Sequence, residues 1–167
     1  MSHTRAYRTL QSGNYDMTFD DVLMIAITHE VRSQGLYRHL RNIVTIPEVQ
    51  AYLQRLEEEE RDHERRLYAF RGSADYNGAS EVGLPHVGDE VLHSHAVYVT
   101  LDKGATREDV LKLAMQREER AVMLFQRLSA LSTDARTRAF FDELAEEEVG
   151  HQETVQKLFG DAGDQPV

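Results

Sequence analysis

The sequence predicts an all-α protein, a four-helix bundle built from a duplicated pair of helices with one long crossover connection. Composition is the first indication: 29% charged and 41% hydrophobic residues, with no tryptophan and only three prolines, are typical of long amphipathic helices. The second is an apolar periodicity of three, four and seven residues, and the third is an internal repeat. The length of 167 residues suits one domain, so residues 1–167 are treated as a single domain.

The internal repeat relates residues 21–70 to residues 109–158. When the chain is shifted by 88 positions, 15 of these 50 pairs are identical and the match needs no gap. The identical pairs include Glu30 with Glu118 and His63 with His151. Shared helical composition would not produce such a match, so we interpret the chain as a duplicated two-helix unit.

The first unit is expected to form helices over residues 18–43 and 46–70. Thr18 and Asp21 have the spacing of a capping pair, in which each residue satisfies a free backbone N–H at the start of a helix. Pro47 marks the start of the second helix, because proline is tolerated in a first helical turn and disfavoured in a helix interior.

The second unit repeats this organisation with expected helices over residues 107–131 and 134–159. Thr106 and Asp109 form the corresponding capping pair, and Asp134 lies at the start of the last helix. Each repeat unit is therefore expected to be a helix hairpin.

The connection over residues 71–105 is rich in glycine and too long for a tight turn. A crossover of this length is needed if the second hairpin starts at the same end of the bundle as the first. It contains His86, His93 and His95, which are either a site that captures metal or ordinary surface histidines. We favour surface histidines.

The main chemical signal is a set of acidic and imidazole side chains on the apolar stripes of all four helices. These six candidate metal ligands are Glu30, Glu60, His63, Glu118, Glu148 and His151. Burying ionised carboxylates costs several kcal/mol each unless positive charge compensates. Two divalent metal ions would balance the charge of the four carboxylates.

The spacing supports the same metal site independently. Glu60 and His63, like Glu148 and His151, are three residues apart and so lie on one face of a helix. We expect each of these glutamates to bridge two metal ions, with Glu30 and Glu118 on the outer sides. Helix bundles with di-metal sites have a known ligand pattern: one glutamate from each of two helices and a Glu-x-x-His motif from each of the other two. Mixed oxygen and imidazole ligands suit iron or manganese, and also zinc.

Tyr37 follows Glu30 by two helical turns on the same stripe. Its hydroxyl group could orient a metal-binding carboxylate across the bundle, or the ring could simply pack in the core with another hydrogen-bond partner. Other polar residues beside the ligand stripes are expected to be solvated. They are His29, His39, Glu57 to Glu59, Glu146 and Glu147.

Several classes of function are disfavoured by composition. The chain has no cysteine, which removes disulfides, thiolate metal sites and iron–sulfur clusters. A net charge of -10 disfavours nucleic acid and anionic membranes as partners. Residues 1–14 lack the apolar segment of a signal peptide, and no apolar run is long enough to span a bilayer. We therefore expect a soluble, cytoplasmic protein.

These motifs resemble the rubrerythrin branch of the ferritin-like superfamily from about Thr18 to Phe159, the crossover excepted. The resemblance is carried by Glu30 with Tyr37, Glu59 to His63, Glu118 with Phe125, and Glu147 to His151. Two features depart from the family pattern. The cysteines of a rubredoxin iron site are absent, and Ala121 stands where rubrerythrins have an extra carboxylate, which leaves a six-ligand set similar to that of bacterioferritin.

The resemblance implies a di-iron centre that reacts with hydrogen peroxide or dioxygen, typically in a homodimer. Because this chain has no rubredoxin cysteines, an external electron donor protein would have to reduce the centre. Two alternatives stay open. The protein could be a ferroxidase or iron-handling protein with Fe(II) as its substrate, or a non-catalytic bundle that its metals stabilise.

Overall fold

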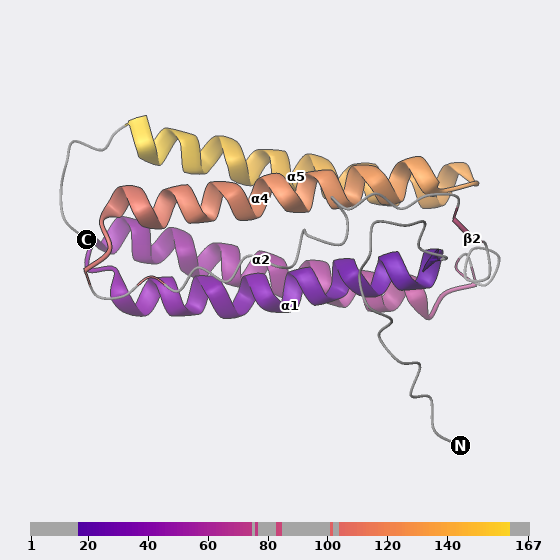
Figure 1. The fold of residues 1–167 in the computed structure, drawn as a ribbon, viewed down its shortest axis with the longest axis horizontal. Coiled ribbons are helices and arrows are strands. Elements are labelled where there is room, and N and C mark those ends of the chain that lie inside the picture. The colour runs from indigo at the N-terminus through magenta and orange to yellow at the C-terminus, as the bar shows by residue number, and fades with distance from the viewer. Residues whose placement is uncertain (1–16, 75, 77–82, 85–100, 102–103, 161–167) are drawn as a thin grey trace, which may run out of the picture.

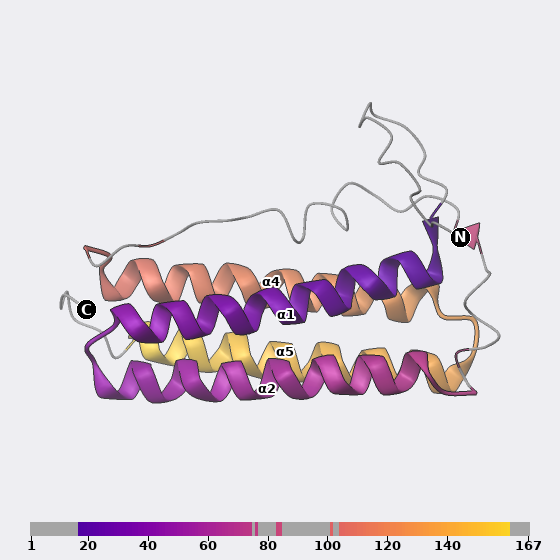
Figure 2. The same ribbon diagram turned by 90° about the horizontal axis from the view of Figure 1, so that it is seen from below.

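The computed structural model describes residues 17–74, 76, 83–84, 101 and 104–160. Its long helices are α1 (Phe19–Ile43), α2 (Pro47–Arg71), α4 (Arg107–Leu131) and α5 (Ala135–Gly160). They lie side by side along one long axis, as Figures 1 and 2 show. The predicted all-α, four-helix fold is confirmed.

The helix starts follow from local sequence chemistry. The Thr18 hydroxyl accepts a hydrogen bond from the Asp21 backbone N–H at 3.2 Å, and the Asp21 carboxylate accepts one from the Thr18 N–H at 2.7 Å. Thr106 and Asp109 form the same reciprocal cap on α4. Pro47 stands in the first turn of α2, where a missing N–H costs nothing. Both predicted capping pairs are confirmed.

A short antiparallel pair of strands joins the residues just before α1 to the crossover. β1 (Met17–Thr18) pairs with β2 (Gly83–Leu84), with Met17 opposite Leu84. This pair was not predicted, and it holds part of the crossover against the start of α1. Most of the crossover, including His86, His93 and His95, lies outside the described residues, so the prediction for these histidines stays a prediction.

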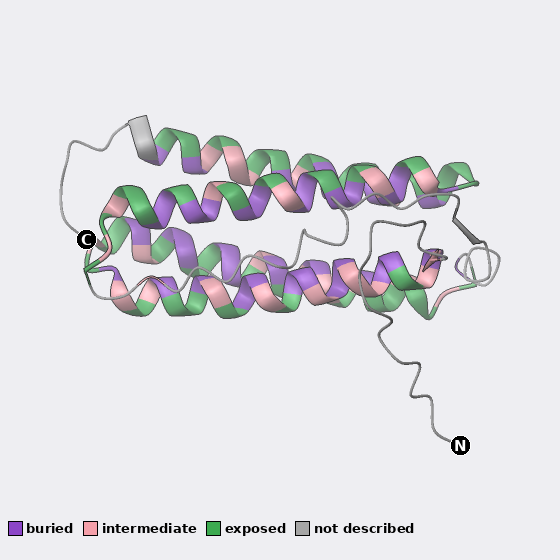
Figure 3. Ribbon diagram, viewed as in Figure 1, coloured by how far each residue is buried: buried purple, intermediate pink, exposed green. Residues whose placement is uncertain are grey.

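The packing joins the two repeat units through their first helices. α1 packs against α2, α4 packs against α5, and α1 and α4 are in contact between the two hairpins. Each helix turns its buried residues towards the bundle axis (Figure 3).

Two apolar clusters occupy the two ends of the bundle. One contains Phe19, Leu23, Phe125 and Phe141, and the other contains Leu40 and further residues of all four helices. In each helix the predicted ligand positions fall between residues of the two clusters. The apolar core therefore closes both ends of a polar layer at mid-bundle. Among the described residues, no helix combines the length and apolar character needed to cross a bilayer.

Candidate metal centre

The structure brings all six predicted ligands together at the middle of the bundle. Glu30, Glu60, Glu118 and Glu148 are at most 1% exposed, and His63 is 2% exposed. His151 is slightly more open, with 12% of its side chain exposed. Within the described part of the chain these residues form two groups of four, in which the ligand atoms lie within 4.8 Å of one another.

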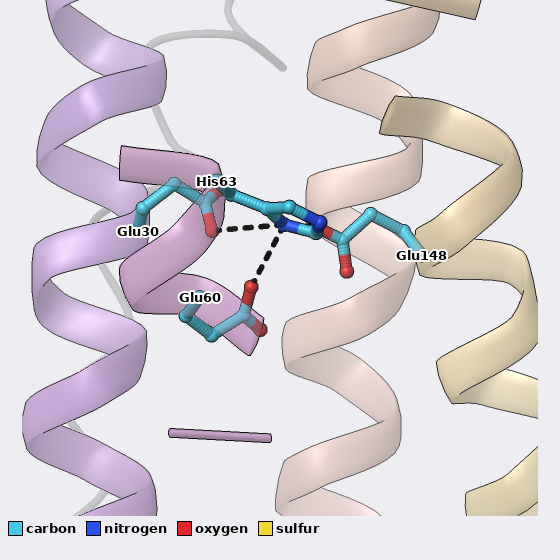
Figure 4. Close-up of side chains that lie close together, drawn as sticks. All are labelled: Glu30, Glu60, His63 and Glu148. Atoms are coloured by element: carbon cyan, nitrogen blue, oxygen red, sulfur yellow. Dashed lines mark hydrogen bonds and ion pairs between the residues drawn. The ribbon is translucent and has the colours of Figure 1, made fainter. Parts of the chain in front are cut away.

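The first group consists of Glu30, Glu60, His63 and Glu148 (Figure 4). The Nδ1 atom of His63 lies 2.9 Å from Glu148 Oε1 and 3.1 Å from Glu60 Oε2. Its distance to Glu30 Oε2 is 3.7 Å. In Figure 4 the Glu30 and Glu60 carboxylates turn towards one side of the His63 ring while Glu148 reaches it from α5.

The second group consists of Glu60, Glu118, Glu148 and His151. The Nδ1 atom of His151 lies 3.0 Å from both Glu118 Oε2 and Glu148 Oε2. The two groups share Glu60 and Glu148, whereas Glu30 and Glu118 each belong to one group. Two neighbouring metal ions would therefore have two shared carboxylates and one outer carboxylate each.

The unsatisfied atoms of this layer fit a cation. Within the described residues, neither carboxylate oxygen of Glu30 accepts a hydrogen bond, although the side chain is fully buried. Burial, followed by repulsion from the Glu60 carboxylate, raises the pKa of Glu30 well above its ordinary value. Burial likewise raises the pKa of Glu118 to about 8. A buried carboxylate with free lone pairs costs several kcal/mol unless a cation or proton satisfies it.

The pKa values of the two histidines are also raised, which for an imidazole favours the charged form. Burial lowers the pKa of His63, but the carboxylates around it outweigh burial and raise this pKa far above its ordinary value. The pKa of His151 is raised for the same reason. Burial raises the pKa of Glu148, but the two imidazoles outweigh it and hold this pKa below its usual range. Without metal, protons on the two imidazoles and on the carboxyls of Glu30 and Glu118 balance the charge of the layer, and metal ions would displace these protons. The donor set therefore fits two divalent metal ions.

Comparison with known proteins shows the family and the fold of the chain. The family model described as rubrerythrin matches residues 21–159. The chain belongs to the rubrerythrin family. A crystal structure from Thermotoga maritima, described as a ferritin-like diiron-carboxylate protein, superposes with a TM-score of 0.74 at 17% identity. The match covers 90% of this chain and 100% of the other, and at this identity it shows the shared fold. Among curated proteins none matches the sequence.

Membership of the rubrerythrin family supports a di-iron protein, and the buried cluster of carboxylates and imidazoles supports a metal site. The assignment of the six residues as metal ligands stays a prediction.

The outer nitrogens of both histidines are held by carboxylates of the opposite repeat unit. His63 Nε2 lies 2.8 Å from Glu147 Oε2, and His151 Nε2 lies 3.1 Å from Glu59 Oε2. Glu147 is fixed in turn by Arg66, whose Nη1 donates to both of its oxygens at 2.9 and 2.8 Å. Such carboxylates fix the orientation of an imidazole and strengthen it as a metal ligand.

The expectation that Glu59 and Glu147 are simply solvated is therefore wrong. They are partly exposed, but each reaches a candidate ligand histidine across the α2–α5 contact. The signal that could have found them is the repeat itself, because both positions carry glutamate in an otherwise divergent pair of helices.

Two further solvation predictions are also wrong. Glu57 is buried because it faces α1, where Arg38 Nη2 donates to its carboxylate at 2.8 Å, and Arg61 Nη2 of α2 donates to it at 2.9 Å. His29 is fully buried because it lies on the side of α1 that faces α4. His39 is exposed, as expected.

The Tyr37 hydroxyl contacts a predicted ligand carboxylate, which was one of the two alternatives that the sequence left open. Its hydroxyl donates a hydrogen bond to Glu118 Oε1 across the bundle. At the repeat-related position, Phe125 packs against His63 in a T-shaped arrangement with ring centroids 6.2 Å apart. The two halves of the centre are therefore chemically different, because among the described residues the Glu118 carboxylate has a hydroxyl donor and the Glu30 carboxylate has none.

Proposed function

We propose that this protein is a di-iron oxidoreductase that reduces hydrogen peroxide or dioxygen with electrons from an external donor protein. The observation that carries the proposal is the sharing of Glu60 and Glu148 between the two groups of four ligands. Carboxylates shared in this way would hold two metal ions close enough to act on one oxidant. One imidazole and three carboxylates per ion also leave coordination positions for that oxidant.

Iron fits these ligands and supplies two electrons, one from each Fe(II) ion. Manganese and zinc fit the same oxygen and imidazole donors, so the choice of iron is part of the proposal. The family match favours iron, since the rubrerythrin resemblance implies a di-iron centre.

The side chains around the centre have separate tasks in this proposal. Glu147 and Glu59 orient the imidazoles of His63 and His151, and Tyr37 fixes one oxygen of Glu118. The apolar clusters at both ends of the layer limit the access of bulk water, which strengthens the electrostatic interactions inside.

The small side chain of Ala121 lies buried one helical turn after Glu118. Rubrerythrins have a carboxylate at this position by the sequence resemblance. An alanine methyl group cannot coordinate a metal, so we propose that this side of the centre is more open to a small oxidant.

The test is turnover of hydrogen peroxide by protein loaded anaerobically with two iron ions per chain. Continuous peroxide consumption with a chemical reductant, at constant bound iron, is the expected result. The variant E60Q/E148Q, which keeps the fold but loses both shared carboxylates, is the matched control and should be inactive. Iron uptake far beyond two per chain would instead indicate a ferroxidase. Stabilisation by metal without any turnover would indicate a structural role.

The assembly and cellular setting are also proposals. We propose a homodimer that works in the cytoplasm, as the family resemblance implies. Sedimentation equilibrium of the iron-loaded protein tests the dimer, and a monomer at all concentrations would contradict it.

A further inference from the structure

A buried arginine lies beside the candidate metal centre and is not one of its ligands. Arg117 directly precedes Glu118 on α4 and is 6% exposed. Its Nε donates to the Ser33 hydroxyl at 2.8 Å, and its Nη2 donates to the His29 carbonyl at 2.6 Å. The guanidinium group is thus fixed between α4 and α1, next to the helix turns that carry both outer carboxylates.

The charge of Arg117 has no direct partner in the described part of the chain. Both of its hydrogen-bond acceptors are neutral oxygens, and no carboxylate of the described residues forms an ion pair with it. The side chain is nevertheless close enough to Glu30 and Glu60 to feel their charges. A guanidinium group carries its positive charge at neutral pH.

The charge balance changes when metal binds. Four carboxylates balance two divalent ions, so the filled centre is neutral while Arg117 adds one positive charge next to it. Arg32 and Arg120, which occupy equivalent positions in the two repeats, lie near enough to Arg117 to repel it. Glu59 and Glu147 add negative charge at the outer nitrogens of the two histidines, between α2 and α5, whereas Arg117 adds positive charge on the side of α1 and α4.

We propose that Arg117 sets the ligand preference of the filled centre by favouring small monoanions, such as azide or a deprotonated peroxide, over neutral ligands. The same positive charge weakens the binding of the metal ions themselves. Unit charges separated by up to about 10 Å, at an effective dielectric constant of about 20, change an ion's affinity by about tenfold. The proposal rests on the metal centre of the proposed function, but not on its turnover.

The opposite signs of these two effects give a direct test. The variants R117M and R117Q remove the charge, and two are made in case one fails to fold. R117K keeps the charge, and S33A removes one hydrogen bond while leaving the charge in place. K112M is the matched control, since Lys112 is an exposed cation on the same helix whose removal changes the net charge equally.

The probes are Co(II) alone and azide added to Co(II)-loaded protein, both followed by absorption spectroscopy. For R117M and R117Q the azide dissociation constant should rise about tenfold, while the Co(II) dissociation constant should fall. R117K, S33A and K112M should stay close to the wild-type protein in azide affinity. Helix content and melting temperature from circular dichroism verify that each variant is folded.

Two results would overturn the role of Arg117. One is an unchanged azide affinity in both charge-removing variants. The other is a joint fall of azide and Co(II) affinity, because the loss of the α1–α4 contacts alone would weaken both. Failure of the wild-type protein to bind Co(II) would instead overturn the metal centre, so the two failures are distinguishable.

Discussion

Replacing Glu147 with glutamine removes the negative charge that holds the outer nitrogen of His63, while the shape of the side chain is kept. The Glu147 carboxylate lies 2.8 Å from His63 Nε2 and is held by two hydrogen bonds from Arg66. A charged acceptor on the outer nitrogen stabilises an imidazole that binds metal through Nδ1. E147Q should therefore lower the affinity for the metal ion that Glu30 and His63 both bind.

The size of this effect follows from the geometry. Hydrogen bonds to charged groups contribute about 1.5–3 kcal/mol, and loss of such an orienting partner lowers metal affinity about 10- to 100-fold. Glu147 is 37% exposed, so solvent screening places the expected loss at the lower end, about tenfold or about 1.4 kcal/mol. The related variant E59Q should cost less, because Glu59 lies farther from its histidine, at 3.1 Å, and is 40% exposed.

The assay is an anaerobic Co(II) titration followed by absorption spectroscopy and fitted with two binding constants. E147Q should weaken one constant about tenfold and leave the other nearly unchanged. E146Q is the control, since Glu146 is exposed and adjacent in sequence and loses the same charge. Equal affinities in E147Q and E146Q would refute the orienting role of Glu147.

Three further predictions concern the ligands, the tyrosine and the fold. The double variant E60Q/E148Q should retain neither metal ion, because both shared carboxylates are lost, and elemental analysis that finds two ions per chain would contradict this. Y37F removes the hydrogen bond to Glu118 and should weaken one Co(II) constant by up to about tenfold, and unchanged constants would mean that the ring only packs. T106A removes the cap of α4 and should lower the free energy of unfolding by about 1 kcal/mol, which urea denaturation measures, and an unaltered midpoint would count against the cap.

The sequence predicted the bundle well because its signals are local. The duplicated Thr-x-x-Asp caps and the proline of α2 define helix starts through contacts within one turn, and the observed bounds lie within one residue of the expected ranges. The ligand stripe was also readable, since a glutamate or histidine at a core position such as Glu30 stands out against its apolar neighbours.

The residues that sequence analysis placed wrongly owe their role to another helix. Glu59, Glu147 and Glu57 occupy polar edges of their own helices, where solvation is the ordinary outcome. Their partners, His151, His63 and Arg38, lie on neighbouring helices, so only the packing of those helices identifies them.

Arg117 was missed for the same reason. In the sequence of α4 it is one basic residue among several. Its burial depends on the packing of α1, which supplies the His29 carbonyl and the Ser33 hydroxyl as hydrogen-bond acceptors. The short β1–β2 pair could not be foreseen either, because two-residue strands carry no periodic pattern.

The central claim is that six buried side chains bind two metal ions with Glu60 and Glu148 shared between them. Anomalous X-ray diffraction at the iron absorption edge, from crystals of protein loaded anaerobically with Fe(II), tests it most directly. We predict two iron peaks, one coordinated by Glu30 and His63, the other by Glu118 and His151, with both shared carboxylates between the peaks. A single peak, or two peaks away from these side chains, would contradict the account.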